Sequence, residues 1–143
     1  LIHRGAKFAF AGVEATVPKV TLVVRKAYGG AYAVMGSKNL NGDINLAWPT
    51  AQIAVMGSAA AVVMLQGKQL AAIEDPAQRE AMKKMFMDFY DAEMTSPYVA
   101  AERGYIDQMI APSETRVALR RALRQLASKQ AFDLPKKHTI SPL

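Results

Sequence analysis

The chain has 143 residues, which suits one compact domain, and its composition of 51% hydrophobic and 21% charged residues is typical of a globular protein. It contains no cysteine, which excludes disulfides and thiolate sites and is compatible with a reducing cytoplasm. The net charge of +6 favours an anionic partner, such as a phosphate-bearing cofactor or an acidic protein. Nucleic acid is not expected, because the basic residues are scattered and no stacking motif of aromatics accompanies them.

The first third of the chain predicts a helix, a strand and a glycine turn. Apolar residues recur at helical spacing from Ala6 to Val17, and Pro18 is expected to end that helix. The segment "KVTLVV" (19–24) is rich in β-branched residues, which predicts a buried parallel strand. After the glycines, residues 31–38 predict a short helix, and residues 44–56 predict one or two short strands.

The middle of the chain predicts two further helices. Residues 58–66 form an alanine-rich run, and Gly67 is expected to end that helix. Asp75 and Pro76 form a strong helix-start signal. In the helix that follows, we expect one buried face and an exterior Glu80–Lys84 pair; the expected face consists of Ala81, Met85, Phe89 and Ala92.

The last third predicts a strand, a helix and an extended tail. Residues 105–110 read as a strand, and Ser113 is expected to cap the final helix. That helix would turn Leu119, Leu123 and Leu126 inward and Arg116, Arg120 and Arg124 to solvent. The tail from Asp133 contains two prolines and is expected to be extended. Alternating strands and helices of these lengths predict an α/β architecture.

No segment suits a membrane span. The longest apolar run, residues 53–65, is interrupted by Gly57 and Ser58 and is too short to cross a bilayer, so no membrane partner is expected. The chain begins with Leu1 directly in helical periodicity, which indicates a processed or truncated chain.

Few side chains suit catalysis. His3 and His138 lie beside basic residues and lack an Asp or Ser partner, which is a poor setting for a general base. No histidine pair has metal spacing, so no metal site is expected, and neither a nucleophile-elbow nor a phosphate-loop pattern occurs. If the protein is an enzyme, we therefore expect its catalytic groups to be backbone amides.

The pair Gly29-Gly30 is the candidate for such amides. It lies between a predicted strand and a predicted short helix, where free N–H groups and the helix dipole can stabilise a developing oxyanion. The alternative is that the glycines only permit a tight turn. The residues alone leave both interpretations open.

Several blocks, in order along the chain, resemble the carboxyltransferase β subunits of biotin-dependent acyl-CoA carboxylases, the propionyl-CoA carboxylase family. They are "GVEATVPK" (12–19), "RKAYGGAY" (25–32), "AWPTAQIAVMG" (47–57), "SPYVAAERGYID" (96–107) and the final "KKHTISPL". The resemblance runs through residues 1–143 and corresponds to the later part of such a subunit's C-terminal half, as one domain.

The resemblance implies a crotonase (ClpP/crotonase) type fold, a partial spiral of ββα units. It implies a site at a dimer interface, where the amides of Gly30 and Ala31 hold charge on the ureido oxygen of biotin and Gly29 shares the biotin contact. Tyr32 and Ala33 would line the substrate pocket. The implied reaction moves a carboxyl group from carboxybiotin to the α carbon of an acyl-CoA.

The implied partners are an acyl-CoA, whose coenzyme A is part of the substrate, and an α subunit with biotin carboxylase and biotin carboxyl carrier domains. A dimer-based hexamer is implied too, in the cytoplasm or, in a eukaryote, the mitochondrial matrix. The fragment alone is expected to be inactive. A non-catalytic assembly subunit is the main alternative; a crotonase-fold hydratase or decarboxylase is weaker, since hydration needs a carboxylate pair that the region lacks.

Three departures from the family pattern affect the expected substrate. Gln52 stands where relatives often have Glu, and residues 58–60 read Ser-Ala-Ala where relatives run "PEGA" or "AEGA". Two carboxylates are thus missing near the expected site. Ala33 stands where short-chain carboxylases commonly have Asp or a branched residue, which predicts a wider pocket and acyl chains longer than propionyl.

Overall fold

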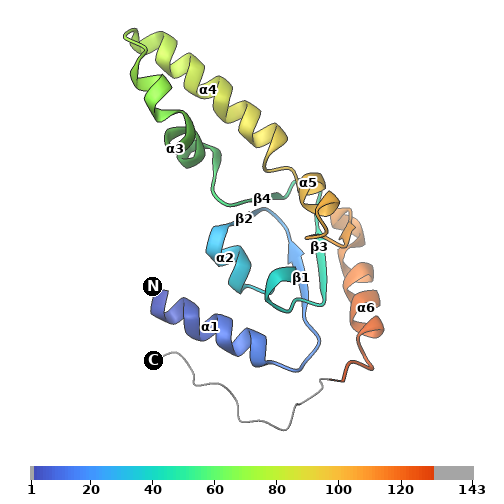
Figure 1. Ribbon diagram of the computed structural model, residues 1–143. Helices are drawn as coiled ribbons and strands as arrows, with labels where there is room; N and C mark the ends of the chain where they lie inside the picture. Colours follow the sequence, from blue (N-terminus) through green and yellow to red (C-terminus); the bar gives the residue numbers. More distant parts are fainter. Residues whose placement is uncertain (1, 131–143) are drawn as a thin grey trace.

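The computed structural model describes residues 2–130, and the predicted tail and His138 lie outside them. The helices and strands alternate along the chain as an α/β protein (Figure 1). In order they are α1 (Ile2–Glu14), β1 (Val20–Val23), β2 (Lys26–Tyr28), α2 (Gly29–Val34), η1 (Lys38–Leu40), β3 (Ile44–Ala47), β4 (Gln52–Ala54), α3 (Ser58–Ala71), α4 (Pro76–Glu93), α5 (Pro97–Glu102), β5 (Gln108–Met109), η2 (Pro112–Glu114) and α6 (Thr115–Gln125).

The strands form two small parallel sheets built from successive ββα units. One sheet has the order β1-β3-β5 and the other pairs β2 with β4. The first strands of the two units pair with each other from Val20↔Ile44 onward, and the second strands pair from Lys26↔Gln52 onward. The units β1–β2–α2 and β3–β4–α3 are therefore stacked one on the other, as the predicted ββα spiral requires.

The core lies between the strands and α5. It consists of small and branched apolar side chains, namely Val23, Ala27, Ala47, Ala51, Ile53, Ala100 and Ile106. Helix α6 contacts β1, and α1 contacts α2. The segment after α5 bonds to β3, since the amide of Asp107 donates to the carbonyl of Asn45 at 2.8 Å.

Helices α3 and α4 form a hairpin that extends away from the strands (Figure 1). The predicted helix start is confirmed, since the Asp75 carboxylate accepts the amide of Ala77 at 3.0 Å and Pro76 opens α4. The predicted buried face is wrong: Ala81, Met85, Phe89 and Ala92 are all exposed. The reason is that α4 packs chiefly on α3 and contacts little else within residues 2–130.

Other expected boundaries differ in detail. Gly67 does not end α3, which continues to Ala71, because the flanking residues favour helix and a single internal glycine costs only about 1 kcal/mol. The exterior ion pair is Glu80–Lys83 at 3.5 Å rather than Glu80–Lys84. The predicted strand 105–110 is reduced to Gln108–Met109, paired with β3.

The last helix begins one residue later than expected. The short helix η2 precedes it, and α6 starts at Thr115 rather than directly after Ser113. Ala122 is buried on its inner face, whereas Leu123 is 52% exposed, contrary to expectation. The arginines expected at the solvent-facing surface, Arg116, Arg120 and Arg124, are exposed.

Candidate functional site

The turn between β2 and α2 has no intervening loop, and its two glycines differ. Gly29 has a φ of +57°, and a Cβ there would lie 2.8 Å from the carbonyl oxygen of Val55. The turn itself therefore requires glycine at position 29. Gly30 has no such constraint, because a Cβ at position 30 would meet nothing within 4 Å. Local packing does not explain the second glycine, and its Cα borders open space.

No side chain caps the amino end of α2. Helical geometry leaves the first N–H groups of a helix without intrahelical partners. The N–H groups of Gly30 and Ala31 belong to this first turn. Their partial positive charge can stabilise an anionic oxygen.

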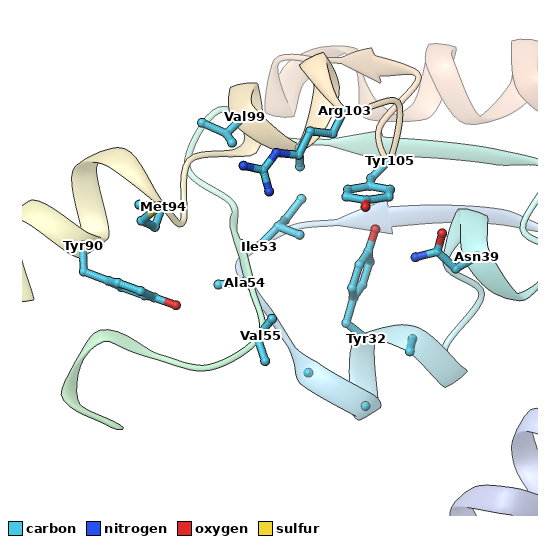
Figure 2. A pocket seen from close by; sticks show the side chains of 14 residues that line it. Tyr32, Asn39, Ile53, Ala54, Val55, Tyr90, Met94, Val99, Arg103 and Tyr105 are labelled. Carbon is cyan, nitrogen blue, oxygen red and sulfur yellow. The ribbon is translucent and has the colours of Figure 1, made fainter. Parts of the chain in front are cut away.

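The turn borders a cavity of about 570 Å³. Four segments enclose it: α2 with the adjoining η1, strand β4, the end of α4, and α5 with the residues after it (Figure 2). Its lining residues are Gly29, Gly30, Tyr32, Ala33, Asn39, Ile53, Ala54, Val55, Tyr90, Met94, Val99, Ala100, Arg103 and Tyr105. The cavity is largely apolar with a few polar groups, as is usual for small-molecule sites.

Most of the residues expected at the site lie together. Gly29, Gly30, Tyr32 and Ala33 all line the cavity. Ala31 is exposed and does not line it, so only its backbone amide, in the first turn of α2, remains a candidate. His3 lies exposed on α1 and is not among the residues that line the cavity.

Sequence reasoning missed the polar groups opposite α2. Arg103, Tyr105 and Asn39 line the cavity, and the Tyr32 side chain points toward Tyr105 (Figure 2). Arg103 and Tyr105 lie in the block "ERGY", where Gly104 has a φ of +77° and reverses the chain after α5. A glycine at a helix end followed by an aromatic residue was the available signal, but it could not reveal which element the arginine faces.

The departures at positions 52 and 58–60 lie beside this cavity and do not line it. Gln52, Ser58 and the adjacent alanines line a separate hollow of about 540 Å³. There the Tyr28 hydroxyl donates to Gln52 Oε1 at 2.7 Å, and the Ser58 hydroxyl donates to Asp91 Oδ2 at 2.9 Å. These polar side chains satisfy one another, so the replacements retain a paired network beside the site.

Two absences can be stated for the described residues. Within residues 2–130, no group of three or more His, Asp or Glu side chains could hold a metal ion. Over the same range, no helix combines the length and apolarity that crossing a membrane requires.

Comparison with known proteins points to one group. Residues 1–140 match the family described as "Carboxyl transferase domain". The propionyl-CoA carboxylase β chain of Saccharopolyspora erythraea is 55% identical over all of this chain and 26% of its own length. The biotin-dependent long-chain acyl-CoA carboxylase β4 subunit of Mycobacterium tuberculosis is 47% identical over all of this chain and 27% of its own.

A solved structure agrees in both fold and sequence. The transcarboxylase 12S structure, described as a hexamer assembly with methylmalonyl-CoA and methylmalonic acid bound, superposes with a TM-score of 0.89 at 42% identity. The match covers 99% of this chain and 27% of that one. The chain therefore spans about a quarter of the length of the relatives it matches, and its fold is the crotonase-like fold of carboxyltransferases.

Proposed function

Because the chain belongs to the carboxyl transferase domain family, we propose that it forms part of the carboxyltransferase subunit of a biotin-dependent acyl-CoA carboxylase. The reaction moves a carboxyl group from biotin to the α carbon of an acyl-CoA. One observation carries the proposal: an uncapped glycine turn borders an apolar cavity that lacks acidic and histidine side chains. Such a site suits chemistry that backbone donors support.

The residues present fit a ureido ring next to the turn. Gly30 leaves space that a Cβ would fill, and the buried Tyr32 hydroxyl has no hydrogen-bond partner within residues 2–130. When bound, biotin supplies the carboxyl group and, after its loss, a negatively charged ureido oxygen. The amides of Gly30 and Ala31 hold that oxygen in the proposed arrangement. Gly29 shapes the turn that aims them.

The proposed assembly is a homo-oligomer, a dimer-based hexamer, working with an α subunit that carries biotin carboxylase and biotin carboxyl carrier domains. The α3–α4 hairpin supports the oligomer, since it leaves Met64 and Phe89 exposed by 73% and 61%. Burying such side chains between subunits would stabilise an oligomer. We place the enzyme in the cytoplasm, or in the mitochondrial matrix of a eukaryote.

The test uses the full-length subunit and a matched pair of proline variants at the two helix starts. Ala31→Pro removes one first-turn N–H of α2, and we expect the rate of carboxyl transfer from methylmalonyl-CoA to free biotin to fall at least about a hundredfold. Proline is usually tolerated in a first helical turn, so the variant should assemble. Ser58→Pro places a proline at the first position of α3, where some relatives have Pro, and we expect its rate to stay within a few-fold.

Two outcomes contradict different parts of the proposal. A wild-type subunit that folds and assembles but transfers nothing would indicate the assembly subunit instead of the enzyme. An assembled Ala31→Pro variant with normal turnover would leave the enzyme in place and remove the backbone amides from its mechanism.

A further inference from the structure

One ionised side chain lines the cavity. Arg103 is the sole Asp, Glu, Lys or Arg among the lining residues, and its guanidinium points into the cavity across from α2 (Figure 2). Its side chain makes no hydrogen bond or ion pair with any residue of the part that the structure describes. An arginine in a largely apolar cavity with its donors unused is free to bind an anion.

The Tyr32 hydroxyl is a second unused donor in the same cavity. It is buried and lacks a hydrogen-bond partner within residues 2–130, and its ring points toward Tyr105 (Figure 2). Burial, and to a lesser extent Tyr105, raises the pKa of Tyr32 above its ordinary value, so the hydroxyl keeps its proton at neutral pH. A buried hydroxyl without a partner is costly, and a ligand oxygen would remove that cost.

The fold fixes the position of Arg103. Ala100, three residues before Arg103, is 5% exposed in the core, and its carbonyl accepts the amide of Tyr105 at 2.9 Å. The amide of Arg103 itself bonds to the carbonyl of Val99 at 3.3 Å, and Gly104 adopts the left-handed conformation that reverses the chain. The arginine therefore stands at a helix end that is anchored in the core.

We propose that Arg103, together with the Tyr32 hydroxyl, binds the carboxylate that is being transferred. The inference rests on the proposed function and adds a site to it. The planar guanidinium matches a carboxylate with two parallel hydrogen bonds, and Tyr32 supplies a third donor. No acidic side chain lines the cavity, so no protein carboxylate there competes with a bound carboxylate for the Arg103 guanidinium. The amides at the amino end of α2 are then left for the ureido oxygen.

The first experiment measures binding, independently of turnover, with the full-length subunit. Methylmalonyl-CoA carries the carboxylate and propionyl-CoA lacks it, so the ratio of their Kd values by calorimetry reports on the site. We expect Arg103→Gln to weaken binding of methylmalonyl-CoA at least about tenfold and that of propionyl-CoA less than twofold. Arg103→Lys should recover part of the ratio, because it keeps the charge but not the two-pronged geometry.

Arg25→Gln is the matched control. Arg25 lines the separate hollow near Gln52, so the same substitution there should leave both Kd values unchanged. Tyr32→Phe removes only the hydroxyl and should lower the ratio by a smaller factor than Arg103→Gln. This variant also keeps the inference testable if Arg103→Gln does not fold.

The second experiment tells the two sources of the carboxylate apart. Arg103 could bind the carboxyl group while it is on biotin rather than on the acyl-CoA. In that case the Arg103→Gln variant has the wild-type Kd ratio, while its rate of transfer to free biotin falls at least tenfold. A normal ratio and a normal rate together overturn the inference. If wild type transfers nothing yet discriminates the two ligands through Arg103, the proposed function fails and the carboxylate site stands.

Discussion

Neither of the two stacked ββα units has a side-chain cap at the start of its helix, yet the surroundings of the two helix starts differ. In the first unit, α2 follows β2 directly, and the polar groups beside its start, on Tyr32 and Arg103, have no partner within residues 2–130. In the second unit, the side chains beside the start of α3 are paired: Ser58 with Asp91, and Gln52 with Tyr28. Unused donors beside a cavity, rather than a helix start alone, distinguish a binding site from a structural element.

The units also differ in what covers their helices. Helix α2 contacts α1, β2 and η1, whereas α3 packs chiefly on α4, and the pair extends from the strands with apolar side chains exposed (Figure 1). Exposure of apolar side chains to water is unfavourable, so these side chains favour burial against a partner. In the proposed arrangement, the first unit holds the chemistry and the second offers the contact surface.

The largest expected effect separates the two glycines of the first unit. Gly30→Ala adds a methyl group where nothing lies within 4 Å, so stability should change by no more than about 1 kcal/mol in either direction. Carboxyl transfer should nevertheless fall at least about tenfold, since the methyl group would occupy the space of the oxyanion. Thermal unfolding and transfer to free biotin, measured on the full-length subunit, check both parts.

Gly29→Ala is the counterpart. Its φ of +57° and the 2.8 Å approach to Val55 make a side chain strained there, at a cost of roughly 1–3 kcal/mol. We expect a lower unfolding temperature. If the Gly30→Ala enzyme has normal turnover, the two glycines serve only to permit a tight turn, which is the alternative that the sequence left open.

An effect on assembly, with catalysis unaffected, is expected at the hairpin. Phe89 is 61% exposed on α4, and burying such a side chain between subunits is worth about 2 kcal/mol. Phe89→Gln should therefore shift the assembly equilibrium by a factor of roughly thirty toward smaller species. Analytical ultracentrifugation of the full-length subunit measures this shift.

Lys84→Gln provides the control on the same helix. Lys84 is exposed and makes no hydrogen bond or ion pair within the described residues, so the same replacement should leave assembly unchanged. Equal dissociation of the two variants, or none in either, would show that the apolar side of α4 is not a contact surface.

Much of the fold followed from the sequence because its signals are local. The β-branched run became β1, and Asp75-Pro76 opened α4. The prediction that one face of α4 is buried was wrong. Helical periodicity identifies an apolar face but not the element that covers it, and nothing within the described residues covers this face. The repeat of ββα units was predicted only from the family resemblance, because it lies in the strand pairing and not in matching residues.

Part of the candidate site could be predicted from the sequence. The glycine turn and its neighbours Tyr32 and Ala33 adjoin in sequence, so one motif located them together. Arg103 lies about seventy positions later and reaches the same cavity only through the packing of α5 on the strands. A long-range juxtaposition of this kind has no signature in a single sequence.

The smallest expected effect concerns the length of the acyl chain and tests whether α2 of the first unit helps to set it. Ala33 lines the cavity and contributes only a methyl group to its wall. An apolar wall favours longer chains, because each buried CH₂ is worth about 0.8 kcal/mol, or roughly a fourfold change in kcat/KM. We therefore expect the full-length enzyme to prefer acyl chains longer than propionyl. Ala33→Asp should remove that preference, since a carboxylate in the wall needs solvation that a longer chain would displace. The measurement is kcat/KM across acyl-CoA lengths for both proteins, with Ala33→Val as an apolar control. Identical profiles for wild type and Ala33→Asp would show that other residues of the cavity set the chain length, and a wild type restricted to acetyl-CoA and propionyl-CoA would contradict the prediction outright.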